Sequence, residues 1–165
     1  MKLTPRVEYL VAKLVVGMHR RMSIAKAETH LLWQSFMPRK KEILNGKNSF
    51  LFSLEVFDEL NYFSPFNPQH EFEKWAAIEV KNVDVIPEGM EKLIIPEGMY
   101  AVFVFKGLRS NAYAFYNQIF SEWLPASEFD LELRPHFALM GEKYKKEDPA
   151  SEEEINIPIK VTDAN

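Results

Sequence analysis

The sequence contains no cysteine, and this absence excludes disulfide bonds, thiolate catalysis and cysteine-based metal sites. Glycine is scarce, with six in 165 residues, and neither a glycine-rich phosphate loop nor a Gly-x-Ser-x-Gly nucleophile motif occurs. The histidines lack the spacing of metal ligands, because they are scattered at His19, His30, His70 and His136. We therefore predict no metal site and no cofactor.

Long hydrophobic runs and an excess of positive charge are absent too. No run approaches the length that crosses a bilayer, and residues 1–18 are broken by Glu8 and Lys13 and followed by no small-residue cleavage site. Twenty basic residues against 24 acidic ones give a net charge of −4, which disfavours binding to nucleic acid. We expect a soluble cytoplasmic protein without a membrane or direct nucleic-acid partner.

Aromatic residues are abundant, with 13 Phe, six Tyr and three Trp. They indicate either a dense core or a pocket for a flat ligand, and composition does not choose between the two. A chain of this length suits one domain, or two small halves fused into one, and buries a sizeable core.

One segment of the sequence nearly repeats itself. Residues 32–38, ending in Pro38, return as residues 119–125, ending in Pro125, with each apolar position answered by an apolar one. Such an echo arises by chance between two amphipathic helices, or it marks a duplicated unit with a seam between its copies.

The elements around the echo favour a duplication. In the first half we predict a strand over residues 7–18, a helix over 25–43 with a break at Pro38, and strands over 50–57 and 75–80. In the second half we predict strands over 91–95 and 99–105, a helix over 109–124, a strand over 131–142 kinked near Arg134 and Pro135, and a last strand over 154–161.

Both halves therefore have the order βαββ. The predicted fold is α+β: tandem βαββ repeats with pseudo-twofold symmetry, an antiparallel sheet with helices packed on one side, and a cleft between the halves. We predict a single domain over residues 1–165, with repeat one at about 5–84 and repeat two at about 90–162.

The strand at 99–105 is apolar on both faces and needs cover on both. Helices cover one face, so the other meets the partner half or encloses a ligand. Two such units facing each other leave an aromatic-lined cleft at their join, where small-molecule sites tend to form.

Two carboxylates within predicted strands are candidates for ligand contact. Glu79 lies in an apolar strand and Glu142 ends another, and either could meet a cationic or hydrogen-bond-donating ligand. The alternative is that both simply point to solvent. For the helix aromatics Trp33, Phe36, Tyr116, Phe120 and Trp123, packing onto the sheet is the default, with one or two reaching the cleft.

The order and spacing of several short motifs resemble the GyrI-like small-molecule-binding family, the AraC- or Rob-type effector-binding domain built from two SHS2-type modules. The motifs are Leu32-Trp33 with Phe36, Trp75 to Val80, Ile95 to Phe103 leading to Lys106-Gly107, Trp123-Leu124-Pro125, Pro135-His136-Phe137 and Ile155 to Lys160. Each motif alone is weak, and together they cover nearly the whole chain.

The resemblance implies a ligand cleft bordered by Tyr100, Trp123 and residues 137–140, with an acidic residue that meets cationic drugs. Where the family often has Phe-Glu-x-Tyr, this chain has Phe137-Ala138-Leu139-Met140, which lacks both the acid and the ring. This departure predicts a more neutral or apolar ligand, unless Glu79 or Glu142 substitutes. Haem, bound by a fold-related family, is disfavoured because no histidine has an obvious cleft position.

The predicted function is a non-enzymatic small-molecule binding module for an effector or drug-like compound, aromatic or lipophilic, and linked to transcription regulation or compound sequestration. The DNA-binding helix-turn-helix that often accompanies the family is not seen in this sequence. The alternatives are a hydrolase of reactive small molecules, as in some free-standing relatives, with Glu79 or Glu142 as acid or base, and an inhibitor-like module with a protein partner. The predicted ligand-binding residues are Trp33, Phe36, Trp75, Glu79, Tyr100, Phe103, Tyr116, Phe120, Trp123, Met140 and Glu142.

Overall fold

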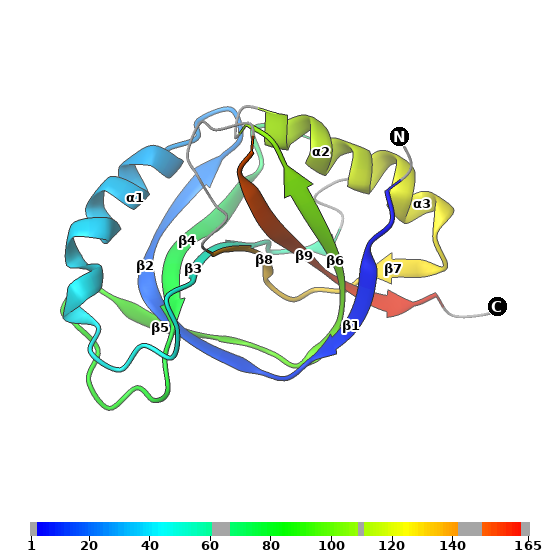
Figure 1. Ribbon diagram of the computed structural model, residues 1–165. Helices are drawn as coiled ribbons and strands as arrows, with labels where there is room; N and C mark the ends of the chain where they lie inside the picture. The colour runs from blue at the N-terminus through cyan, green and yellow to red at the C-terminus, as the bar shows by residue number, and fades with distance from the viewer. Residues whose placement is uncertain (1–2, 61–66, 109–110, 142–149, 163–165) are drawn as a thin grey trace.

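The computed structural model describes residues 3–60, 67–108, 111–141 and 150–162. Nine antiparallel strands within these residues form one curved sheet, flanked by two helical segments (Figure 1). The strands are Arg6–Leu10 (β1), Lys13–Ser23 (β2), Leu51–Val56 (β3), Glu71–Glu79 (β4), Glu91–Ile95 (β5), Gly98–Lys106 (β6), Phe129–Leu131 (β7), His136–Met140 (β8) and Glu152–Val161 (β9).

The first helical segment is α1, Thr29–Phe36, which continues as a 3-10 helix over Met37–Glu42. Pro38 lies in the first turn of that 3-10 helix, where its missing N–H costs no hydrogen bond. The second segment consists of α2, Ala112–Gln118, a π-helical turn over Ile119–Trp123, and α3, Leu124–Ala126.

The sheet curls at two neighbouring bends, one between β1 and β2 and one between β5 and β6. The chain passes from β1 into β2 and from β5 into β6, while β1 pairs with β6 and β2 pairs with β5. The strand order is β1-β6-β9-β8-β3-β4-β2-β5, with β7 added beside β9. The result is a ring-like sheet with a concave inner face and a convex outer face (Figure 1).

Large apolar side chains fill the inner face. Leu54, Trp75, Tyr100 and Phe137 are almost fully buried there, although they come from β3, β4, β6 and β8. The Tyr100 hydroxyl donates a hydrogen bond to the backbone oxygen of Pro135, so its buried polar atom is satisfied. This cluster joins the two halves of the chain into one core.

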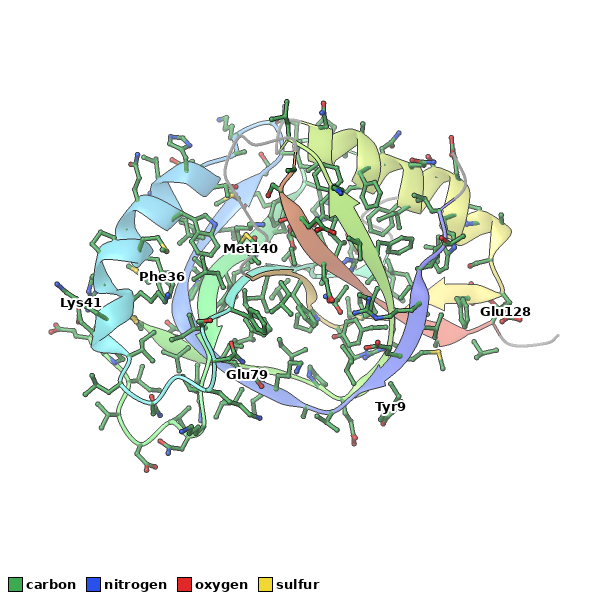
Figure 2. All side chains as sticks on the ribbon, in the orientation of Figure 1. Tyr9, Phe36, Lys41, Glu79, Glu128 and Met140 are labelled. Carbon is green, nitrogen blue, oxygen red and sulfur yellow. The ribbon has the colours of Figure 1, made fainter. Side chains whose placement is uncertain are left out.

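The helices cover two separate parts of the outer face. Leu32 and Phe36 of α1 are buried against β2 and β4. Figure 2 shows Phe36 on the side of α1 that faces the sheet. Ile119 and its helical neighbours pack on Phe103 and Ile157 of β6 and β9. No helix in the described part of the chain is long and apolar enough to span a membrane.

The predicted α+β class is confirmed, and several element bounds are corrected. The strand expected over 7–18 is two strands, because the chain bends at Val11 and Ala12 to follow first β6 and then β5. The strand expected over 131–142 is also two, β7 and β8, with Arg134 and Pro135 between them. Both pair with β9, at different parts of that strand, and β8 pairs with β3 as well. β4 begins at Glu71, earlier than expected. Residues 109–110 and 142 lie outside the described residues.

The two-faced strand at 99–105 has the cover that its composition demands. Ala101, Phe103 and Phe105 meet the second helical segment, and Tyr100 and Val102 enter the inner core with side chains from the first half of the chain. The sequence left two alternatives for the second face of this strand, contact with the other half of the chain or contact with a ligand. In the structure this face packs against the other half of the chain.

His136 of β8 is the clearest buried titratable group in the fold. The aromatic rings of Phe57 and Phe120 pack against its imidazole. Burial, together with the positive charge of Arg134, lowers the pKa of His136 from 6.5 to about 3. Between these two pH values the unfolded chain binds a proton at His136 and the folded chain does not, so folding stability falls as the pH drops.

Because of His136, we expect the unfolding free energy of the wild type to fall by about 1 kcal/mol for each unit by which the pH drops below about 6. Urea unfolding at neutral and mildly acidic pH measures the slope. The variant His136→Leu should have a shallower slope, since only the histidine contribution is removed. Equal slopes for the two proteins would show that His136 takes up its proton without unfolding.

Candidate functional site

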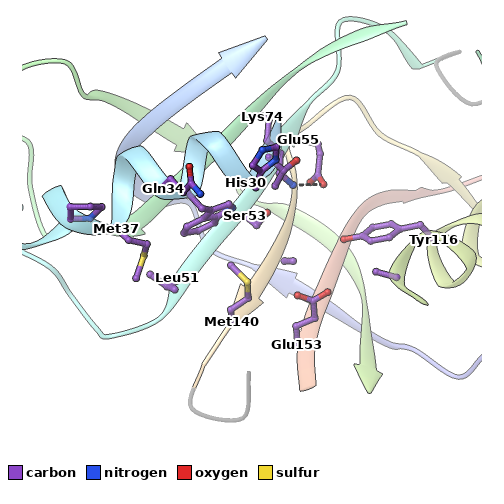
Figure 3. Close-up of a pocket in the computed structure, with 15 residues that line it drawn as sticks. His30, Gln34, Met37, Leu51, Ser53, Glu55, Lys74, Tyr116, Met140 and Glu153 are labelled. Carbon is purple, nitrogen blue, oxygen red and sulfur yellow. Dashed lines mark hydrogen bonds and ion pairs between the residues drawn. The ribbon is translucent and has the colours of Figure 1, made fainter. Parts of the chain in front are cut away.

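A groove lies between α1 and α2, over the outer face of the central strands, and it has a volume of about 640 Å³ (Figure 3). This volume falls in the range of small-molecule sites. The residues that line it are Thr29, His30, Trp33, Gln34, Met37, Pro38, Leu51, Ser53, Glu55, Lys74, Ala112, Tyr116, Ala138, Met140 and Glu153.

Small side chains in the sheet create the hollow. Ser53 of β3 lies directly opposite Ala138 of β8, at the centre of the floor. Because side chains alternate along a strand, the next residues on the same face are Leu51, two positions before Ser53, and Met140, two positions after Ala138, and both are larger. The helices stand apart on either side, so nothing from the described chain fills the space above these two small residues.

The walls are aromatic and apolar. Trp33 and Met37 come from the α1 side, and Tyr116 projects its hydroxyl into the groove from α2 (Figure 3). Faces of tryptophan and tyrosine rings attract cations as well as flat apolar groups. The walls therefore suit a ligand that carries aromatic rings, with or without a positive charge.

Two carboxylates reach the groove from different strands. Glu55 is on β3 and Glu153 is on β9. The Lys74 ammonium, from β4, lies 2.9 Å from Oε1 of Glu55 in an ion pair whose side chains are only 10% and 18% exposed. Oε2 of Glu55 is buried and accepts no hydrogen bond from the described residues. Such an oxygen has room for a donor or a cation supplied by a ligand.

Tyr116 stands within the field of both carboxylates. Burial of the hydroxyl raises its pKa well above 10.0, and the negative charges of Glu55 and Glu153 raise it further. The phenol therefore stays protonated at physiological pH and acts as a hydrogen-bond donor. With Lys74 counted against the two glutamates, the groove has a formal charge of −1.

The structure brings three of the predicted site residues into the groove, namely Trp33, Tyr116 and Met140. Five others belong to the packing of the fold. Phe36 is buried under α1, Phe103, Phe120 and Trp123 lie under the second helical segment, and Tyr100 is in the inner core.

The remaining predicted residues are also away from the groove. Trp75 lies in the inner core, on the opposite face of the sheet, with its ring stacked on His19. Glu79 is buried at the C-terminal end of β4, where it accepts a hydrogen bond from Asn48 and pairs with Lys13 and Lys47. Glu79 therefore neither points to solvent nor lines the groove. Glu142 lies outside the described residues.

The position that often holds an acid in the family is Ala138 in this chain, and the acids that line this groove come from other positions. Ala138 does lie on the floor, as the resemblance implied, but Glu55 and Glu153 supply carboxylates from the neighbouring strands. The sequence does carry a signal for Glu55. Ser53 and Glu55 alternate with the buried apolar residues Phe52 and Leu54 along β3. This alternation indicates that the polar residues lie on the face of the strand opposite to the apolar core. The described residues contain no cluster of potential metal ligands.

Comparison with known protein families places this geometry in context. Residues 3–161 match the model of a family described as the GyrI-like small molecule binding domain. The transcriptional regulator BrlR of Pseudomonas aeruginosa is 29% identical over 147 residues, which are 88% of this chain and 51% of BrlR. The chain thus spans about half the length of that regulator.

Solved structures share the fold at low sequence identity. SAV2435 bound to tetraphenylphosphonium superimposes with a TM-score of 0.69 at 16% identity, covering 96% of this chain and 94% of SAV2435. The C-terminal domain of EcmrR gives a TM-score of 0.68 at 13% identity, with 98% and 100% covered. A hydrolase from Listeria innocua gives 0.58 at 12% identity, with 96% and 93% covered.

Proposed function

Because this chain belongs to the GyrI-like small-molecule-binding family, we propose that its interhelical groove binds a lipophilic, aromatic cation. The observation that carries this proposal is the pair of carboxylates, Glu55 and Glu153, at the base of an aromatic-walled groove. A monovalent cation in the groove offsets its formal charge of −1. The rings of Trp33 and Tyr116 add cation–π attraction on either side.

The solved relative SAV2435, which holds tetraphenylphosphonium, supports the choice of probe. That ion has a single positive charge shielded by four phenyl rings, so its affinity depends on aromatic walls and on a negative field rather than on directed hydrogen bonds. The groove described above offers both.

Isothermal titration calorimetry tests the proposal. We expect tetraphenylphosphonium to bind about tenfold or more tightly than triphenylphosphine oxide, a neutral compound with similar rings, because only the cation gains from the carboxylates. Raising the salt concentration should weaken the binding of the cation more than the binding of the neutral oxide. Equal affinities would contradict a cation site, and absence of binding by both would contradict a ligand groove for compounds of this class.

We further propose that the chain works as a ligand-responsive module, in transcription regulation or in compound sequestration. The similarity to the regulator BrlR supports the first role. The hydrolase and protein-partner alternatives remain predictions. For the hydrolase, Glu79 contributes little, since its carboxylate is engaged at the end of β4 and does not line the groove.

Two βαββ copies also form part of the proposal, at about residues 5–84 and 90–162. The order β2-α1-β3-β4 is matched by β6-α2-β8-β9. In each set the last strand pairs with the first strand and with the strand before it, and the middle strands, β3 and β8, pair with each other. The groove then lies at the seam between the copies, over the β3–β8 pair.

A further inference from the structure

Lys74 is an unusual component of a groove proposed to hold a cation. Its residue is only 8% exposed, and its side chain comes from the strand next to Glu55. Glu55 and Lys74 are directly opposite in the β3–β4 ladder, so the backbone itself holds the ammonium beside the carboxylate. The ion pair is thus built into the sheet and does not depend on a mobile surface side chain.

The groove has two carboxylates, and the Lys74 ammonium pairs with one of them, Glu55. Oε1 of Glu55 is 2.9 Å from the Lys74 ammonium, and Figure 3 shows this contact along one side of the groove. Glu153 reaches the groove from β9, on the other side of the β8 strand that provides Ala138. One resident positive charge therefore stands against two negative charges before any ligand enters.

We propose that Lys74 is a resident counter-cation that makes the groove selective for monocations over dications. The inference rests on the proposed function, since it concerns the charge of the ligand that the same groove accepts. A monocation brings the groove to neutrality. A dication leaves it with an excess positive charge and meets the Lys74 ammonium in a partly desolvated site, where like charges repel strongly.

The alternative is that Lys74 only fastens β3 to β4. Loss of a purely structural lysine would change the affinities of monocations and dications by similar factors. Loss of a resident counter-cation changes their ratio, because it removes a repulsion that acts on the second charge. The ratio of two affinities is therefore the decisive readout.

The experiment uses two probes of almost equal size and shape, N-methyl-phenylpyridinium, a monocation, and methyl viologen, a dication. We expect the wild type to prefer the monocation. In Lys74→Met the affinity for methyl viologen relative to the monocation should rise about tenfold or more, since a unit of repelling charge is gone. Lys74→Arg keeps the charge and should keep the wild-type ratio.

Controls separate the outcomes. Lys160→Met makes the same substitution at a lysine whose side chain is 51% exposed outside the groove, and it should leave the ratio unchanged. If Lys74→Met unfolds, as a melting curve would reveal, Lys74→Gln provides a second neutral side chain. An unchanged ratio in the folded neutral variant overturns the proposed role of Lys74 and leaves the proposed function of the groove standing. Failure of the wild type to bind the monocation and tetraphenylphosphonium overturns the proposed function as well.

Discussion

Replacing both groove carboxylates, by Glu55→Gln and Glu153→Gln together, is expected to weaken tetraphenylphosphonium binding by about 100-fold or more. The double variant changes the formal charge of the groove from −1 to +1, because Lys74 stays. The cation then meets repulsion where it met attraction, while the aromatic walls are unaltered. Calorimetry measures the loss.

The single variant Glu153→Gln isolates the electrostatic part, since it leaves the Lys74–Glu55 ion pair intact. It should weaken binding by about tenfold. The matched control is Glu154→Gln, one residue along β9 and on its other face, where the Glu154 carboxylate accepts hydrogen bonds of 2.7 and 2.9 Å from Arg6. Full affinity in the double variant, or equal losses in Glu153→Gln and Glu154→Gln, would mean that the cation does not sit over these carboxylates.

Gly17→Ala is expected to destabilise the protein by about 4 kcal/mol or more, a loss that few single substitutions reach. Gly17 lies in β2, between β4 and β5, and faces Ala77 in the ladder. A Cβ atom at this position would overlap the backbone oxygen of Ala76 and lie 2.6 Å from Cα of Ala77. Both are backbone atoms of a strand held on two sides, so they have little freedom to move away.

Gly46→Ala is the matched control, because the same methyl group there meets only Ile78 Cδ1 at 3.4 Å and Asn48 O at 3.8 Å. We expect its unfolding free energy to stay within about 1 kcal/mol of the wild type. Urea or thermal unfolding of the two variants gives the comparison. If Gly17→Ala is as stable as Gly46→Ala, then β2 and β4 are not as closely packed as described.

The fold could be predicted from sequence wherever composition is locally decisive. The β-branched and aromatic run of β6 and the alternation of β9 gave strands close to those observed. The bend between β1 and β2 could not be found, because Val11 and Ala12 resemble their neighbours. The break is set by pairing with β5 and β6, which are distant in the chain. Long-range register is not visible in one sequence.

The candidate site was predictable only in part for the same reason. Helical spacing indicated Trp33 and Tyr116, since each lies on a helix that had to face the sheet. It did not distinguish them from Phe36 and Trp123, whose side chains differ only in which part of the sheet lies beneath them. Glu55 and Glu153 were missed because their proximity depends on the order β9-β8-β3, which brings distant strands to one floor.

Methyl NMR of the methionines is the most direct measurement of where a lipophilic cation binds. Met37 and Met140 line the groove, whereas Met22 and Met90 are buried in other clusters and serve as internal references. The phenyl rings of tetraphenylphosphonium should shift the Met37 and Met140 signals in a saturable way and leave those of Met22 and Met90 in place. Shifts confined to Met22 or Met90, or no saturable shift at Met37 and Met140, would contradict a cation-binding groove between α1 and α2.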